Sequence, residues 1–122
     1  MTTILLVEDE VLLREGVQEM LEAHDYKVIG AGDGIEAMEW LEQVPVSLII
    51  TDIIMPNMDG IEFVEKVRVK YPDLPIVVIS GSPGAVMNRL GISNIQVPGA
   101  TASIMKPFKS TDLLIAVQKL LA

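Results

Sequence analysis

The sequence predicts an α/β fold in which one parallel β-sheet is covered by helices on both faces. Short apolar runs rich in branched residues, such as residues 3–7 and 76–79, alternate with longer stretches in which apolar residues recur at helical spacing. Polar or acidic residues follow several of the short runs directly, a pattern typical of buried parallel strands. Strict alternation of strands and helices implies right-handed crossovers and a sheet buried on both faces.

The first half of the chain contains two predicted strands and two predicted helices. Thr3 to Val7 predicts the first strand, and Lys27 to Gly30 predicts a brief second one. The helix between them has an apolar stripe on one face and polar residues, Arg14 among them, on the other. The apolar stripe consists of Leu13, Val17, Met20 and Leu21.

The tetrapeptide Asp-Gly-Ile-Glu occurs twice, at residues 33–36 and 59–62, and each copy predicts a helix start. The aspartate can accept hydrogen bonds from the first free N–H groups of the helix, while the glutamate three residues later reaches back. The flanking sequences do not match, so we interpret the two copies as similar caps and not as an internal repeat.

The second half completes five strand and helix pairs, for which the flavodoxin-like strand order 2-1-3-4-5 is the leading candidate. Ser110 is the predicted cap of the last helix, whose apolar stripe contains Leu113, Leu114, Val117, Leu120 and Leu121. Between Ser80 and Ala102, glycines and prolines leave one short predicted helix around Ala85 to Leu90. The remaining predicted elements are Ser47–Thr51, Ile61–Lys70, Pro75–Ser80 and Ala102–Met105.

The composition narrows the function classes. A length of 122 residues fits a single domain over residues 1–122. The absence of cysteine excludes disulfides, thiolate metal sites and a cysteine nucleophile, and it agrees with a reducing, cytoplasmic location. No apolar run approaches a membrane span, and the start of the chain does not resemble a signal peptide. A net charge of −8 with scattered basic residues makes direct nucleic-acid binding by this domain an unfavourable interpretation.

Chemistry-bearing side chains follow the predicted strands. Glu8 and Asp9 follow the first strand, Asp52 the third, Ser80 ends the fourth and Lys106 follows the fifth. In a doubly wound sheet, ligands bind outside the carboxyl ends of the strands where the strand order reverses. The sequence therefore predicts three carboxylates, a hydroxyl and an ammonium group at one edge of the sheet.

These groups predict a metal-assisted phosphoryl acceptor. Two carboxylates about 4 Å apart repel by roughly 4 kcal/mol at an effective dielectric of about 20, so a cation is needed between them. Mg²⁺ accepts one or two carboxylates plus waters and a phosphate oxygen, and we expect Asp9 and Asp52 as ligands, with Glu8 acting through water. Asp52 could accept a phosphoryl group as an acyl phosphate, with Lys106 and Ser80 stabilising its charge.

The same residues resemble the response regulator receiver domain of two-component signalling systems. The resemblance includes the acidic pair after the first strand, the hydroxyl of Ser80 and the string Lys106-Pro-Phe108. Its most specific part is Asp52-Ile-Ile-Met-Pro-Asn-Met-Asp-Gly60, and it extends along nearly the whole chain.

The resemblance implies a signalling domain that is not a conventional enzyme. In the family, the aspartate matching Asp52 is phosphorylated by a histidine kinase or a phosphotransfer protein. Mg²⁺ binds at the positions of Asp9 and Asp52 and at the backbone carbonyl of Ile54. The peptide bond between Lys106 and Pro107 is expected to be cis.

The sequence departs from the family at two places. Receivers usually carry an aromatic residue three positions before the lysine, where the ring changes orientation on phosphorylation, and this chain has Ser103 there. The stretch from Ser80 to Lys106 is a few residues longer than usual and rich in glycine and proline. We therefore do not assume that the ordinary output surface is used.

Two other function classes fit the sequence less well. A degenerate receiver that binds partners regardless of phosphorylation is suggested by Ser103, but the full acidic site argues against it. A flavodoxin would need a phosphate-binding loop where Glu8, Asp9 and Glu10 would repel a phosphate. A haloacid-dehalogenase-type phosphatase would need Asp-x-Asp after the first strand, and Val11 occupies the second position.

Overall fold

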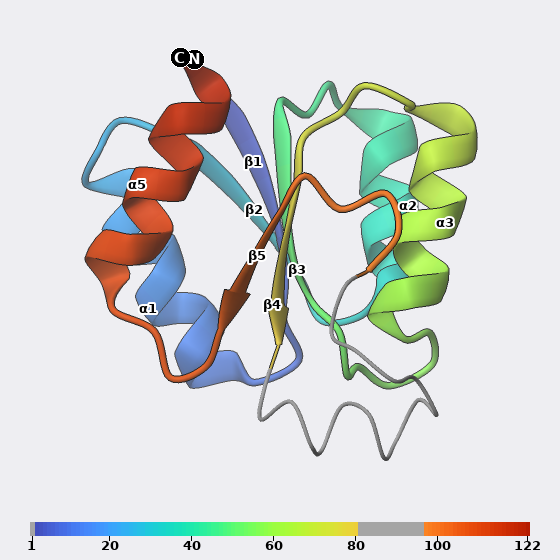
Figure 1. Ribbon diagram of the computed structural model, residues 1–122, viewed down its shortest axis with the longest axis horizontal. Coiled ribbons are helices and arrows are strands. Elements are labelled where there is room, and N and C mark those ends of the chain that lie inside the picture. Colours follow the sequence, from blue (N-terminus) through green and yellow to red (C-terminus); the bar gives the residue numbers. More distant parts are fainter. Residues whose placement is uncertain (1, 81–96) are drawn as a thin grey trace.

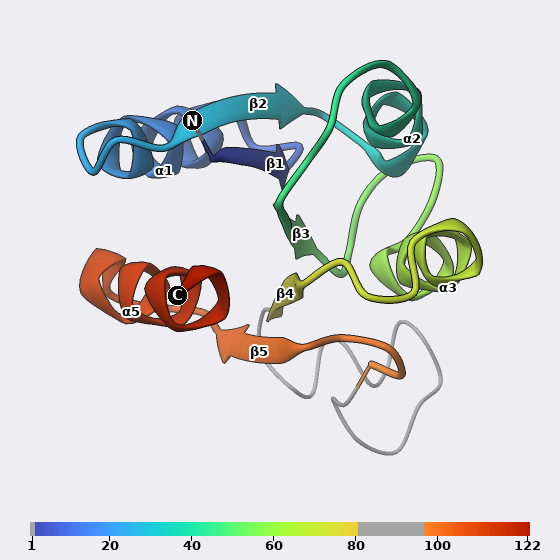
Figure 2. The same ribbon diagram turned by 90° about the horizontal axis from the view of Figure 1, so that it is seen from above.

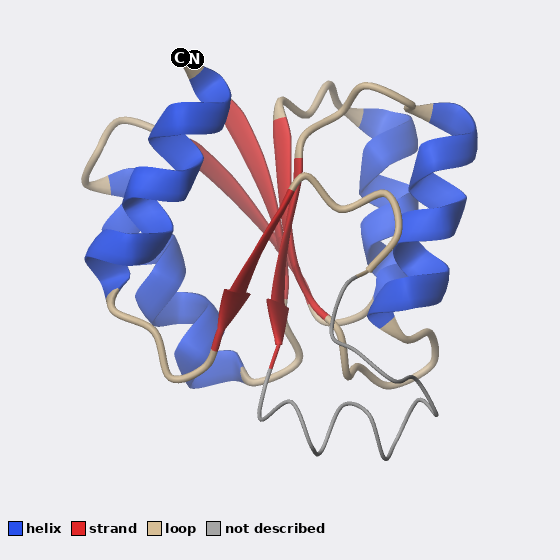
Figure 3. Ribbon diagram, in the orientation of Figure 1, coloured by secondary structure: helices blue, strands red, loops and turns tan. Residues whose placement is uncertain are grey.

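The computed structural model describes residues 2–80 and 97–122, over which strands and helices alternate as predicted (Figure 1, Figure 3). The predicted helix around Ala85 to Leu90 lies outside the described residues. The strands are β1 (Thr3–Val7), β2 (Lys27–Ala31), β3 (Leu48–Asp52), β4 (Ile76–Ser80) and β5 (Ala102–Met105). The described helices are α1 (Val11–Glu22), α2 (Gly34–Gln43), α3 (Gly60–Lys70) and α5 (Ser110–Leu121).

The strands form one five-stranded parallel sheet in the order β2-β1-β3-β4-β5, which confirms the predicted flavodoxin-like topology. The strand order reverses between β1 and β3, the two strands that carry the acidic residues. In the register, Asp52 pairs with Ile79 and Ser80 pairs with Met105. The carboxyl ends of all strands therefore meet at one edge of the sheet.

Helices α1 and α5 cover one face of the sheet, and α2 and α3 cover the other (Figure 2). Each face has its own apolar core, as a parallel sheet buried on both sides requires. The predicted stripes of α1 and α5 pack in the same core, with Val17, Leu21, Leu113 and Val117 buried and the other stripe residues partly buried. None of the described helices is both long enough and apolar enough to cross a membrane.

The helix starts confirm two of the three predicted caps. Asp33 accepts a hydrogen bond from the Glu36 amide at 2.8 Å, and Asp59 accepts one from the Glu62 amide at 2.9 Å. The Ser110 prediction is wrong, because Lys109 occupies the cap position of α5 and no side chain caps that helix. Ser110 is the first helical residue, a shift of one position that helix boundaries commonly show.

Candidate functional site

The acidic residues converge at the carboxyl edge of the sheet, between the ends of β1 and β3. One carboxylate oxygen from each of Glu8, Asp9 and Asp52 lies within 4.8 Å of the others. Glu8 and Asp52 are buried, whereas Asp9 is exposed to solvent. Three oxygen-bearing ligands at this spacing suit a hard divalent cation such as Mg²⁺, with water and phosphate oxygens completing the coordination.

Asp52 is a buried carboxylate with partners on both oxygens. The residue is 8% exposed, and Oδ1 accepts a hydrogen bond from the Ile53 amide at 2.7 Å. Lys106 Nζ lies 2.9 Å from Oδ2 of Asp52 and 3.3 Å from Oε1 of Glu8. The ammonium group therefore bridges the carboxylates of Glu8, which follows β1, and Asp52, which ends β3.

Lys106 reaches this position from the end of β5. Its backbone amide donates to the Ser80 carbonyl at 2.7 Å, which holds the end of β5 beside the end of β4. The Lys106–Pro107 peptide is cis, which confirms that prediction. The ammonium group is only partly buried, so it remains open to solvent and to an incoming anion.

The other predicted site residues lie around this centre. Ser80 is 2% exposed at the end of β4, the strand next to β3. The Ile54 side chain packs against the apolar core beneath α2 and α3, and the role of its carbonyl stays a prediction. Ser103 is exposed on β5, paired in register with Val78.

The pKa values of Glu8 and Lys106 are both raised, for different reasons. Burial raises the pKa of Glu8 and the negative charge of Asp52 adds to this, which together outweigh the amide of Glu10 and the charge of Lys106. Burial lowers the pKa of Lys106, but the hydrogen bond and charge of Asp52, together with Glu8, outweigh it and raise that pKa. Three carboxylates share this centre with the single ammonium group of Lys106.

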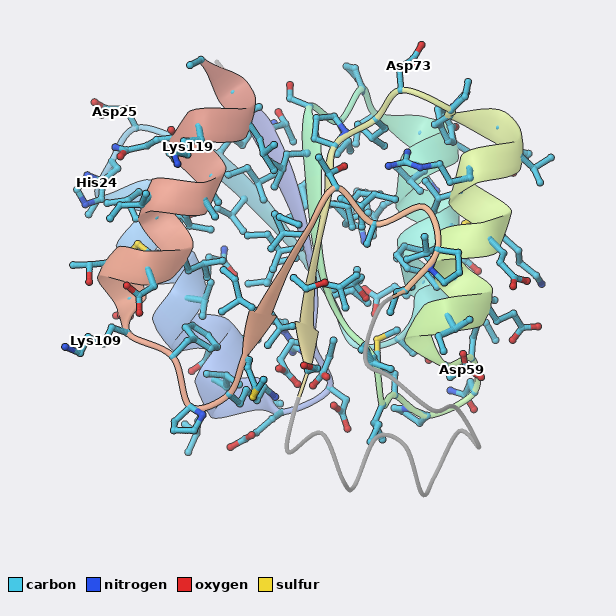
Figure 4. All side chains as sticks on the ribbon, viewed as in Figure 1. His24, Asp25, Asp59, Asp73, Lys109 and Lys119 are labelled. Carbon is cyan, nitrogen blue, oxygen red and sulfur yellow. The ribbon has the colours of Figure 1, made fainter. Side chains whose placement is uncertain are left out.

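The loop from β3 to α3 is held in place by contacts that the sequence did not predict. Asn57 donates through Nδ2 to Oδ2 of Asp33 at 2.7 Å and adopts a left-handed backbone conformation, with φ of 68°. Hydrogen bonds to the Asp33 carboxylate from the Glu36 amide and from Asn57 lower its pKa. Asp59, at the α3 end of this loop, lies at the same edge of the sheet as the acidic site (Figure 4). No local signal predicts a pair 24 residues apart.

Arg14 corrects a second expectation. The helical pattern placed it on the polar outer face of α1, but its side chain is half-buried and Nη1 donates to the Glu8 carbonyl at 2.6 Å. The sequence shows only that an arginine lies six residues after Glu8, which does not by itself predict this hydrogen bond. Only the fold shows that the guanidinium reaches back to the acidic turn.

Replacing Glu8 with glutamine is expected to stabilise the metal-free protein at neutral pH. Because the pKa of Glu8 is raised in the folded state, its ionisation opposes folding at pH values above the folded pKa. As the pH falls through the folded pKa towards the unfolded value of about 4.3, wild-type Glu8 takes up a proton and the difference should disappear. Thermal unfolding with EDTA across this range measures the effect. An E8Q variant less stable than wild type at neutral pH would contradict it.

Comparison with known proteins identifies the same family that the sequence resembles. A family model described as "Response regulator receiver domain" matches residues 4–118. The chain is 36% identical to the response regulator receiver protein CpdR of Brucella abortus, covering 99% of this chain and 98% of that protein. It is 37% identical to the transcriptional regulatory protein PdtaR of Mycobacterium tuberculosis, covering 94% of this chain but only 54% of that longer protein.

Solved structures agree with the sequence relatives. The response regulator TrrA of Thermotoga maritima, solved in complex with Mg²⁺ and BeF, superimposes with a TM-score of 0.84 at 30% identity, over 99% of this chain and 100% of that one. The chemotaxis response regulator CheY4 of Vibrio cholerae gives a TM-score of 0.80 at 32% identity, over 99% of both chains. The chain belongs to the family of response regulator receiver domains of two-component systems.

Proposed function

We propose that Asp52 accepts a phosphoryl group from a histidine kinase or a histidine phosphotransfer protein, and that phosphorylation controls binding of a partner. The observation that carries the proposal is the contact between Lys106 and Asp52, at 2.9 Å, beside two further carboxylates. A cation and an acidic cluster around one buried aspartate provide the charge balance that an acyl phosphate needs.

In the proposed reaction, one oxygen of Asp52 forms a bond to phosphorus as the bond from phosphorus to the donor's imidazole nitrogen breaks. The electron pair of the broken bond stays on the imidazole. Lys106 already contacts Oδ2 of Asp52, so a small movement of its ammonium group would bring it to an oxygen of the phosphoryl group. Ser80, at the end of the adjacent strand, would donate a hydrogen bond to another of these oxygens.

Mg²⁺ is the cofactor that this reaction requires in our proposal. Asp9, Asp52 and the Ile54 carbonyl would hold the ion, with Glu8 acting through a water molecule. When bound, Mg²⁺ neutralises charge on the transferred group. The exposed carboxylate of Asp9 supports this division of roles, because the open side of the cluster is where water and phosphate oxygens would complete the coordination.

The proposal is tested with acetyl phosphate as a small-molecule donor. Intact mass spectrometry of the protein incubated with acetyl phosphate and Mg²⁺ should show the addition of a single phosphoryl group. EDTA should prevent the addition, and so should the D52N substitution. A D59N variant is the matched control, because Asp59 caps α3 and is not a proposed acceptor. Wild-type protein that gains no mass would refute the proposal.

A second function, partner binding independent of phosphorylation, is favoured by one observation. Ser103 is exposed on β5 and carries no ring to couple the site to the surface. Beryllofluoride, a stable mimic of the phosphoryl group, separates the two functions. A partner that binds with equal affinity with and without beryllofluoride would favour the phosphorylation-independent function, whereas a change in affinity would support the switch.

A further inference from the structure

We infer that Arg14 is a positioning residue for the metal-binding turn, and that it acts by fixing the peptide group between Glu8 and Asp9. The inference rests on the proposed function, since it concerns how the Mg²⁺ ligands are oriented. Arg14 belongs to the second turn of α1, and its guanidinium reaches back over the β1–α1 turn to the Glu8 carbonyl at 2.6 Å.

The turn has few other restraints at this peptide. The Glu8 amide donates to the Ala31 carbonyl at 2.9 Å, which fixes the start of the turn to β2. The Glu10 amide donates to Oε2 of Glu8 at 3.1 Å, which fixes its end. The Glu8 carbonyl lies between these two anchors, and Arg14 is the hydrogen-bond donor that the structure shows for it.

The planarity of the peptide bond explains why this one contact matters. The carbonyl of Glu8 and the Cα atom of Asp9 share a plane, so a donor that fixes the carbonyl also fixes the position of the Asp9 Cα atom. The two proposed ligand side chains leave the backbone from opposite ends of that plane. Arg14 therefore restrains the backbone positions from which the Glu8 and Asp9 side chains extend, and it does so through the Glu8 carbonyl alone.

The absence of a side chain at Gly30 leaves room for the Arg14 side chain to pass. A Cβ atom on Gly30 would lie 3.2 Å from Cδ and 3.4 Å from Nε of Arg14, closer than nearly all such contacts. Gly30 lies in β2, paired with Leu6, and its backbone conformation is open to other residues. An alanine there would require the Arg14 side chain to shift by a few tenths of an ångström, which would perturb its contact with the Glu8 carbonyl while leaving every charge in the protein unchanged.

The contact is directional and not a charge pair. Among residues 2–80 and 97–122, Arg14 forms no ion pair within 4.0 Å. The two possible roles of Arg14 therefore predict opposite changes in Mg²⁺ affinity when it is replaced. If Arg14 acted only through its charge, removing it would strengthen Mg²⁺ binding to the acidic cluster. If it positions the turn, removing it should weaken Mg²⁺ binding.

Mg²⁺ affinity, followed by amide NMR shifts during titration with magnesium chloride at constant ionic strength, tests the inference. We expect R14M to weaken binding about tenfold, as loss of a group that orients a ligand commonly does. R14K should recover part of the loss, because lysine retains a donor. G30A should weaken binding in the wild-type background but should add little to R14M, because both substitutions disrupt one contact.

Arg68→Met is the matched control. Arg68 donates to the carbonyls of Gly99, Tyr71 and Leu74. Asp73, in the loop between the last two of these residues, lies at the end of the molecule opposite Asp59 and the site (Figure 4). This variant should lower the unfolding temperature without weakening Mg²⁺ binding. Unchanged or tighter Mg²⁺ binding by R14M or G30A would overturn the inference while leaving the proposed function intact. A wild-type protein that does not respond to Mg²⁺ would instead overturn the proposed function, and this inference with it.

Discussion

Replacement of Gly60 by alanine is expected to destabilise the protein by about 3 kcal/mol, a large share of the stability of a domain of this size. Gly60 is the first residue of α3, and a Cβ atom there would lie 2.5 Å from the Asp52 carbonyl oxygen and 2.6 Å from Cα of Ile53. Both are backbone atoms at the end of β3, so no side-chain rotation relieves the clash. The helix must move away from β3. Chemical denaturation measures the loss.

Gly16 provides the control for this prediction, because the same substitution there meets no atom within 4 Å. Gly16 lies inside α1, where alanine is preferred over glycine, so G16A should stabilise the protein by about 0.5–1 kcal/mol. The two substitutions are therefore expected to change the stability of the protein in opposite directions. A G60A protein with a wild-type denaturation midpoint would show that the close approach of α3 to β3 does not constrain the fold.

Replacement of Lys106 by methionine should separate metal binding from phosphoryl acceptance. Lys106 is the cation that contacts both Asp52 and Glu8, so its removal leaves more negative charge for Mg²⁺ and should tighten Mg²⁺ binding. Loss of a charged donor to the transferred group should slow phosphorylation by acetyl phosphate about a hundredfold. Initial rates at saturating Mg²⁺ and a separate Mg²⁺ titration measure the two effects.

Lys109 controls for net charge in this experiment. It is exposed at the start of α5 and points away from the sheet (Figure 4). K109M makes the same change in total charge as K106M and should leave both the phosphorylation rate and the Mg²⁺ affinity near wild type. Equal phosphorylation rates for the two variants would remove Lys106 from the proposed mechanism.

The fold was predictable because the central strands of the sheet are buried on both faces. Every residue of β3 and β4 is buried, so these strands read as short apolar runs that stand out from the amphipathic helices. The β5 strand has alternating burial and is a short, less apolar run, so its signal in the sequence is weaker. The prediction of Ser110 as the cap was wrong because sequence preference alone cannot decide between neighbouring positions. In the structure the cap residue is Lys109, and α5 begins at Ser110.

The positions of site residues at strand ends were predictable from the sequence. The hydrogen bonds that hold the surrounding turns in place were not. Glu8, Asp9, Asp52 and Lys106 follow strands whose ends meet, so the topology alone brings them together. The contacts of Arg14 with the Glu8 carbonyl and of Asn57 with Asp33 depend on side-chain paths across the loops. Neither pair has a spacing or pattern that marks it in a sequence.

The most direct test of the central claim is to locate the phosphoryl group. Borohydride reduces an acyl phosphate on aspartate to homoserine, and tandem mass spectrometry of the digested protein then identifies the reacted residue. After incubation with acetyl phosphate and Mg²⁺, we expect homoserine at position 52 and at no other aspartate or glutamate. Homoserine at position 9, or no conversion in a protein that gained phosphoryl mass, would contradict the assignment of Asp52 as the phosphoacceptor.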